Sequence, residues 1–296
     1  MAEINGAKLA APEVSPAVVI KAQVLLDRAG YSSGVIDGYA DGNFTNAVRA
    51  FQQQTGLPAS GDLDPPTWAK LVATSAEPAL KEYVISGDDV RGPFIAELPE
   101  DYTKQAELKE LAYTGPSELL AERFHMDEHL LADLNPGKAF GRAGTRIIVA
   151  NVRREAPKLE VTRIVVDNAH RTVRAFDREG KLVAFFPASV GDGEKPAPRG
   201  TLKITRVVKY PVYYYNPKFR FPGVTAQQRL RIAAGPNNPV GSVWMNLDKR
   251  TYGIHGTAEP RNIGRAPSHG CVRLTNWDAR SLAAMVKKGT TVEFTN

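Results

Sequence analysis

The stretch HGTAEPRNIGRAPSHGCVRLTN, residues 255–276, contains the only cysteine of the chain, Cys271. Two of the five histidines, His255 and His269, lie within sixteen positions upstream of it. A thiol attacks a carbonyl as the thiolate, so it needs a base or a cation beside it. Glycines at positions 256, 264 and 270 predict a loop with sharp turns. We therefore predict that this stretch is a reaction centre with a cysteine nucleophile, although a lone cysteine is more often a small buried apolar residue.

The spacing within the stretch suggests how the site is built. His255 ends a predicted strand, and the loop after it is long enough to fold back toward Cys271. His269 and Arg273 are each two positions from Cys271, which places them on its face of an extended segment. Arg273 suits a carboxylate, and the amides of Gly270 and Cys271 are natural oxyanion donors. Loop packing for His269 and a structural salt bridge for Arg273 remain open alternatives.

Length and composition restrict the class of protein. The chain has 296 residues, 43% of them hydrophobic and 24% charged, which fits two or three globular domains of about 100–150 residues. No run approaches the roughly 18 apolar residues of a membrane span. A single cysteine excludes an intramolecular disulfide framework. The first residues lack the basic and apolar regions of a signal peptide, so we expect either an intracellular protein or one whose export signal has been removed.

The formal net charge of +6 is unevenly distributed. Residues 157–296 hold 23 Lys and Arg against 10 Asp and Glu, a balance of +13, whereas residues 1–156 have a balance of −7. Such asymmetry suggests that the C-terminal part meets an anionic partner. No helix-turn-helix, zinc-finger or RNA-binding signature accompanies the basic residues, so we favour another anionic polymer over nucleic acid.

We expect residues 1–14 to be a flexible tail and residues 15–75 to form a small all-α domain of three helices. Ser15-Pro16 predicts a helix start and Gly30 its end, a second helix covers 43–55, and a third begins near residue 65. The region resembles the peptidoglycan-binding domain of cell-wall enzymes, although a generic helical bundle is the alternative. The matching motifs are Gly30-Tyr31, Asp37-Gly38, Ala47-Val48, Phe51-Gln52, Gly56-Leu57-Pro58, Gly61 and Thr67-Trp68.

Residues 79–152 predict a small α+β domain. A strand near 83–86 is followed by a Pro-containing linker over 93–109, helices over 117–124 and 128–134, and a strand over 145–149. This order, with its LNPG turn, resembles a LysM glycan-binding domain carrying an insertion.

The string HMDEH at 125–129 matches the H-x-x-E-H zinc pattern. We find no convincing third ligand near it and interpret it as a solvated helix face. We therefore predict no metal and no cofactor.

Residues 157–296 predict a mostly β domain, with short strands over 159–166, 171–176, 181–190 and 201–208, then a helix over 277–286 and a closing strand. An aromatic run could line a groove or pin a long insertion on the sheet, and we leave both interpretations open. Its members are Tyr210, Tyr213, Tyr214, Tyr215, Phe219 and Phe221.

The opening stretch and its surroundings resemble the L,D-transpeptidase catalytic domain of the YkuD type over about 159–294. The matching motifs are Tyr252-Gly253-Ile254-His255-Gly256-Thr257, Ile263-Gly264, Ser268-His269-Gly270-Cys271-Val272-Arg273-Leu274 and Asn276, with Gly191, Pro198-Arg199-Gly200 and 235–241 upstream. The resemblance implies a β-sandwich-like fold. It implies Cys271 as nucleophile, His255 as general base, Ser268 and His269 as residues that order the thiol and its loop, and Gly270 in the oxyanion hole. It also implies substrate contacts from Arg273, Tyr252, Thr257, Asn276 and Trp244.

The implied reaction acts on peptidoglycan tetrapeptide stems in the periplasm or cell wall. The thiolate releases D-Ala, forms a thioester, and an amine of a neighbouring stem resolves it into a 3→3 crosslink. Water as acceptor would give an L,D-carboxypeptidase or endopeptidase, and a protein lysine would give a protein-anchoring enzyme. A non-catalytic wall-binding protein is the alternative of another class. The upstream domains would raise the local substrate concentration, so deleting residues 1–75 should weaken sacculus binding and leave turnover of soluble stem peptides intact.

Overall fold

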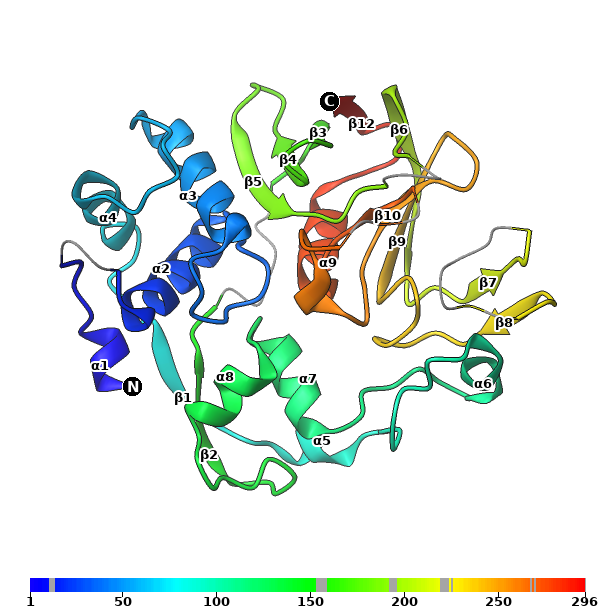
Figure 1. Ribbon diagram of the computed structural model, residues 1–296, viewed down its shortest axis with the longest axis horizontal. Helices are drawn as coiled ribbons and strands as arrows, with labels where there is room; N and C mark the ends of the chain where they lie inside the picture. Colours follow the sequence, from blue (N-terminus) through cyan, green and yellow to red (C-terminus); the bar gives the residue numbers. More distant parts are fainter. Residues whose placement is uncertain are drawn as a thin grey trace.

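The computed structural model describes residues 1–10, 14–152, 159–191, 196–218, 224, 226–266, 268 and 270–295. A helical N-terminal region lies beside a sheet-containing C-terminal region, and a middle region runs beneath both (Figure 1). Within these described ranges, no helix combines the length and the apolar character needed to cross a membrane.

The N-terminal region has the three helices that the sequence predicts. Ser15 caps the first by accepting a hydrogen bond from the Val18 amide, and Gly30 ends it in the left-handed conformation at φ 91°. Phe51 and Leu25 are buried where the helices meet. The helices are α2 (Pro16–Ala29), α3 (Gly42–Thr55) and α4 (Pro65–Val72).

The flexible tail expected over 1–14 is wrong for the described part of that segment. The chain starts with a short helix, α1 (Ala2–Asn5), and Ile4 is buried in the core of the middle region. The Asn5 side chain donates to the Leu80 carbonyl at 3.0 Å and accepts from the Leu80 amide at 2.7 Å. The Asn5 side chain thus pairs with the backbone of Leu80 as a neighbouring strand would. The local sequence gives no sign of this long-range contact.

The middle region pairs its first and last strands across two helices. The strands are antiparallel, with Leu80 opposite Ala150, and Phe124, Leu131 and Ile147 are buried between sheet and helices. The predicted strands and helices are therefore present. They are β1 (Leu80–Val84), α7 (Pro116–Arg123), α8 (Glu128–Asp133) and β2 (Arg146–Ala150).

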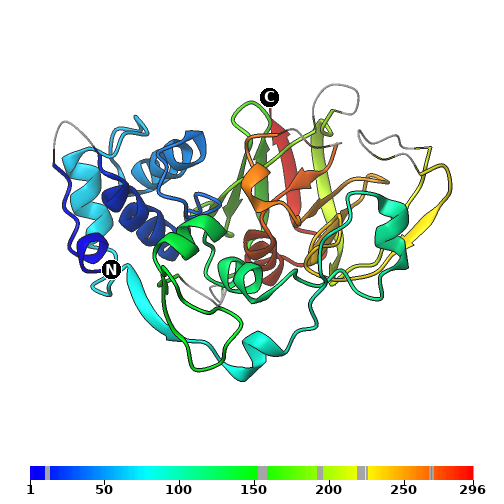
Figure 2. The ribbon, with the colours of Figure 1, turned by 60° about the horizontal axis from the view of Figure 1, so that its bottom comes forward.

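The predicted linker contains a further helix, α6 (Tyr102–Glu107), and another, α5 (Gly87–Arg91), ends just before the linker begins. The chain from α5 to α6 leaves the middle region and runs beneath the C-terminal region to the hairpin of β7 (Tyr213–Tyr215) and β8 (Leu230–Ile232) (Figures 1 and 2). Helix α6 packs against β8 there. We call residues 92–115 the arm.

The C-terminal region is mostly β, as predicted, but its strands form one continuous sheet. The order is β11-β10-β9-β6-β12-β3-β4-β5. Strand β6 pairs with β12 through its first residues and with β9 through its last, and its register shifts between Ile204 and Arg206. Because both halves of the sheet bury side chains in one apolar core, the sheet curls around that core.

Helix α9 (Asn276–Met285) packs against β9 and β10, and adds Leu282 to the same core. The strands are β3 (Arg163–Asp167), β4 (Thr172–Phe176), β5 (Leu182–Pro187), β6 (Gly200–Lys209), β9 (Val243–Leu247), β10 (Gly253–His255), β11 (Val272–Arg273) and β12 (Thr291–Thr295), and a short 3-10 helix, η1 (Pro260–Asn262), lies between β10 and β11.

The loop between α2 and α3 joins all three regions. The Ser32 amide donates to the Phe185 carbonyl of β5 at 2.9 Å, and the Ile36 amide donates to the His125 carbonyl of the middle region at 2.8 Å. The Ser32 hydroxyl also donates to the Asp278 carboxylate of α9 at 3.0 Å. The N-terminal helices are thus packed on the C-terminal region rather than tethered to it.

Candidate active site

The sheet brings His255, Cys271 and Arg273 together. Strands β10 and β11 are parallel neighbours with His255 opposite Arg273, and Cys271 immediately precedes β11. Facing residues of parallel strands share a face, and so do residues two positions apart. All three side chains line one cavity of about 820 Å³.

His255 is a buried, neutral base. Its Nδ1 lies 2.7 Å from the Gly256 carbonyl oxygen, which only accepts, so Nδ1 holds the proton and Nε2 is left basic. The Trp244 ring stacks on the imidazole with centroids 5.2 Å apart. Burial and, to a smaller extent, the Arg273 charge lower the pKa of His255 to about 3, against the opposing effect of the Gly256 hydrogen bond.

Cys271 is half-buried at the wall of the cavity. Its thiol donates to the Thr251 carbonyl across 3.6 Å. The Ser268 hydroxyl donates to the Cys271 carbonyl, which ties the two ends of the SHGC turn. Gly270 has φ 97°, a conformation that side chains rarely adopt, so this turn needs glycine before the nucleophile. His269 lies outside the described residues.

Arg273 presents its charge to the cavity. No carboxylate forms an ion pair with it within the described part of the chain, and its buried Nε has no hydrogen-bond partner there. The structural salt bridge considered as an alternative therefore has no partner in this part. The guanidinium remains available to an anionic group of a substrate.

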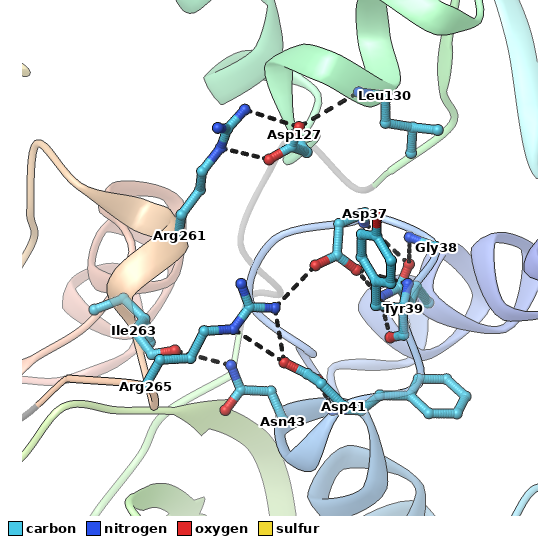
Figure 3. Close-up of polar contacts among 12 residues, drawn as sticks. Asp37, Gly38, Tyr39, Asp41, Asn43, Asp127, Leu130, Arg261, Ile263 and Arg265 are labelled. Carbon is cyan, nitrogen blue, oxygen red and sulfur yellow. Dashed lines mark hydrogen bonds and ion pairs between the residues drawn. The ribbon is translucent and has the colours of Figure 1, made fainter.

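The loop from β10 to β11 is held by the other two regions (Figure 3). Arg265 pairs with Asp41 at 2.9 Å and with Asp37 at 3.1 Å, both in the N-terminal region. Arg261 pairs with Asp127 of the middle region at 2.5 Å. Acidic residues of both upstream regions thus hold the loop that leads to Cys271.

Contacts between Asn43 of α3 and the backbone of the same loop add to these ion pairs. Asn43 donates from its side chain to the Ile263 carbonyl at 2.9 Å, and Gly264 packs so closely that a Cβ there would lie 2.1 Å from Asn43 Oδ1. Gly264 also has φ 75°. A glycine is therefore required where this loop, residues 256–271, meets α3. We call it the catalytic loop.

The groove interpretation of the aromatic run is correct for two members, and a third packs a hairpin on the arm rather than on the main sheet. Tyr213 and Tyr214 line the cavity, whereas Tyr215 is 2% exposed and holds the hairpin on the arm. Tyr210 lines a second cavity, between α9 and the upstream regions. Phe219 and Phe221 lie outside the described residues.

Of the five predicted substrate contacts, Arg273 and Trp244 line the cavity and three do not. The prediction that Asn276 contacts substrate is wrong. Asn276 is fully buried, its Oδ1 accepts from the Ser242 amide, and its Nδ2 donates to Glu122. Thr257 is also buried, and its hydroxyl accepts from the Glu259 amide. Tyr252 extends toward the Pro196 carbonyl. These three side chains support the loops around the site instead.

The interpretation of HMDEH as a solvated helix face is wrong for His125. This residue precedes α8, pairs with Asp27 at 2.8 Å and stacks on Trp277 with centroids 5.2 Å apart. It therefore belongs to the junction of the three regions. His129 is exposed on α8, and in the part that the structure describes no cluster of metal-binding side chains forms.

Among the cavity residues that were not predicted are Tyr102 of the arm and Glu259 of the catalytic loop. Tyr102 is far from Cys271 in the chain, and no sequence signal connects them. Glu259 lies inside the opening stretch, and its carboxylate was the available signal.

A buried neutral imidazole beside a thiol, with a cation on the same wall, defines a cysteine acyltransferase site. The family model described as "L,D-transpeptidase catalytic domain" matches residues 161–294, and that described as "Putative peptidoglycan binding domain" matches residues 15–71. A relative from Bacillus licheniformis, "Putative L,D-transpeptidase YkuD", is 34% identical over 180 residues, which cover 60% of this chain and 92% of that protein. The chain belongs to the L,D-transpeptidase family.

Other L,D-transpeptidases are similar to this chain at lower sequence identity. "Probable L,D-transpeptidase YbiS" of Escherichia coli K12 is 30% identical over 185 residues, covering 61% of this chain and 60% of that protein. The solved L,D-transpeptidase of Xylanimonas cellulosilytica aligns with a TM-score of 0.41 at 17% identity, covering 97% of this chain and all of that one. The structure from Mycobacterium smegmatis gives 0.39 at 18% identity, over 54% and 76% of the two chains.

Proposed function

We propose that the protein crosslinks peptidoglycan by acyl transfer through Cys271, acting in the cell wall. The observation that carries this is the shared cavity of Cys271 and His255, with Nδ1 held by Gly256 and Nε2 free to take a proton. The substrate follows from the family, whose members act on stem peptides.

The first half-reaction acylates the enzyme. His255 Nε2 takes the thiol proton, and the Cys271 sulfur attacks the amide carbonyl before the terminal D-Ala of a tetrapeptide stem. The amides of Gly270 and Cys271 stabilise the oxyanion, a contribution of about 3–4 kcal/mol in such enzymes. D-Ala leaves with the proton held by His255, and a thioester remains on Cys271. Arg273 binds a carboxylate of the stem.

The second half-reaction transfers the acyl group. An amine of a neighbouring stem attacks the thioester, and a 3→3 crosslink results. Water or a protein lysine in place of that amine gives hydrolysis or protein anchoring by the same acyl-enzyme.

We propose that the upstream regions bind the wall polymer. The match of residues 15–71 supports a peptidoglycan-binding role for the N-terminal helices. The antiparallel pair β1–β2 enclosing α7 and α8 supports a LysM-like glycan-binding role for residues 79–152.

Muropeptide analysis tests the proposed function. Mass spectrometry after incubation with the wild-type protein should show new 3→3 dimers, and Cys271→Ala should reduce them by about 10³-fold or more because the nucleophile is gone. Shortened monomers without dimers would instead indicate hydrolysis. Equal dimer formation by both proteins would contradict the proposal.

A further inference from the structure

The arm reaches the catalytic cavity and is fixed there. The Leu111 amide donates to the Ala234 carbonyl at 2.9 Å, and the Asn237 amide donates to the Leu111 carbonyl at 2.9 Å. Gly235 lies so close that a Cβ there would be 2.1 Å from Leu111 O. Apolar side chains of the arm and the β7–β8 hairpin form one cluster, which includes Leu98, Leu108, Leu111, Tyr215, Leu230 and Ile232.

Tyr102 is the residue of the arm that lies at the cavity wall. Its ring packs edge-on against Tyr213 and Tyr215, with centroids 6.1 and 5.6 Å apart, and it lines the same cavity as Cys271. Its hydroxyl has no hydrogen-bond partner within the described ranges. Burial raises the pKa of Tyr102, and the charges of Arg273 and Glu259 act on that pKa in opposite directions. The hydroxyl is therefore protonated at neutral pH, in a cavity that a cation, Arg273, and an anion, Glu259, also line.

Glu259 gives the cavity its negative side. It is the one acidic side chain among the described residues that line the cavity, whereas Arg206 and Arg273 are basic. Glu259 Oε2 accepts from Asn262 Nδ2 at 2.6 Å, which orients the carboxylate and leaves Oε1 for a further donor. A diamino acid side chain is an ammonium at neutral pH, so it is attracted to Glu259 and repelled by the two arginines.

We propose that Tyr102 and Glu259 form the subsite that positions the attacking amine of the acceptor stem. This inference rests on the proposed function. One of the two residues, Tyr102, comes from the arm and not from the C-terminal region. The bound ammonium loses one proton to solvent, and the amine attacks the thioester carbon. The C–S bond breaks, and the second proton of the amine passes through His255 to the Cys271 sulfur. Tyr102 and Glu259 are positioning residues and take part in no bond change.

Two conservative variants test the subsite. Tyr102→Phe removes the hydroxyl and keeps the ring packing, and Glu259→Gln removes the charge and keeps an acceptor for Asn262. With a tetrapeptide donor and a varied acceptor stem, each variant should raise the acceptor KM about three- to tenfold, because one polar or charged contact is lost. The share of hydrolysed product should rise, while D-Ala release at saturating donor stays within about twofold of wild type.

The matched control is Glu107→Gln, which removes the same charge from an exposed position on α6. It should leave the partition between dimer and hydrolysed product unchanged. An unchanged partition in both subsite variants, or a parallel fall in D-Ala release and dimer, would overturn the inference. If the wild-type protein released no D-Ala at all, the proposed function would fail instead.

Discussion

At the scale of single residues, the site depends on a histidine that is kept neutral. The imidazole is stacked on Trp244. It is buried and close to the Arg273 charge, and these two features disfavour the imidazolium. A base must be unprotonated to take the thiol proton. His255 is therefore ready to act over the whole physiological range, and the acidic limit of activity should lie far below the ordinary histidine value of about 6.5.

The pH dependence of acylation checks this. The rate of Cys271 acylation by a carbapenem should stay nearly constant as the pH falls from 7 to 5, and decline only as it approaches the His255 pKa of about 3. Arg273→Gln should move the acid limb to higher pH, because one cause of the lowered pKa is removed. Arg206→Gln, which removes another cavity charge, should leave the limb in place. A wild-type limb near pH 6.5 would contradict the account.

Sequence reasoning predicted that Cys271 and His255 lie together, which the structure shows, but it did not predict every side-chain orientation. Cys271 and His255 could be predicted because a thiol nucleophile and its base must lie close together. A strand end at His255 and a glycine turn before Cys271 allow this. Asn276 and Thr257 belong to the same motif, yet they face the interior and support loops. A motif gives the order of residues along the chain, whereas the direction of each side chain depends on packing. Tyr102 could not be predicted, because its place at the cavity is set by tertiary contacts alone.

At the scale of elements, local signals were sufficient where caps and turns decide the structure. Ser15, Asp41 and Asp64 each cap a helix through a side-chain hydrogen bond, and Gly30 and Gly56 end two of them. Helices α1 and α6 were missed. Each is only one or two turns long and is held by contacts with distant residues, so its own sequence carries little signal.

The catalytic loop is the element whose order matters most, and Arg265 holds it to the N-terminal region. Arg265→Ala should speed amide hydrogen exchange in residues 256–266 and slow Cys271 acylation by about three- to tenfold, since the nucleophile's loop loses an anchor. Because Arg265 is 47% exposed, the melting temperature should change by only about 1–2 °C.

The matched control for that variant is Arg91→Ala, which removes an exposed arginine paired with Asp88 on α5. It should affect neither exchange in the loop nor acylation. Unaltered exchange in residues 256–266 of Arg265→Ala would show that the pairing with Asp37 and Asp41 does not order the loop.

At the scale of the whole molecule, the three regions are joined by buried surface. Leu182 and Phe185 of β5 are buried in the same apolar cluster as Tyr31 and Phe51 of the N-terminal helices. Deleting residues 1–75 exposes these side chains and releases the catalytic loop. The expectation that such a deletion separates wall binding from turnover assumed tethered modules, and the packing removes that assumption.

The uneven charge of the chain also has an internal cause. Basic residues of the C-terminal half pair with acidic residues upstream: Arg261 with Asp127, Arg265 with Asp37 and Asp41, and Arg280 with Glu122 at 2.9 Å. Part of the asymmetry therefore stabilises the junction. Composition predicted an anionic polymer as partner, and it could not distinguish that partner from the upstream half of the chain itself.

Intact-protein mass spectrometry with a tetrapeptide stem as donor and no acceptor tests the central claim most directly. The wild-type protein should gain the mass of the stem without its D-Ala, and peptide mapping should place this adduct on Cys271. Cys271→Ala should gain no mass and release no D-Ala, while Ser281→Ala, a control away from the catalytic cavity, should behave as wild type. An adduct on another residue, or D-Ala release undiminished in Cys271→Ala, would contradict the account.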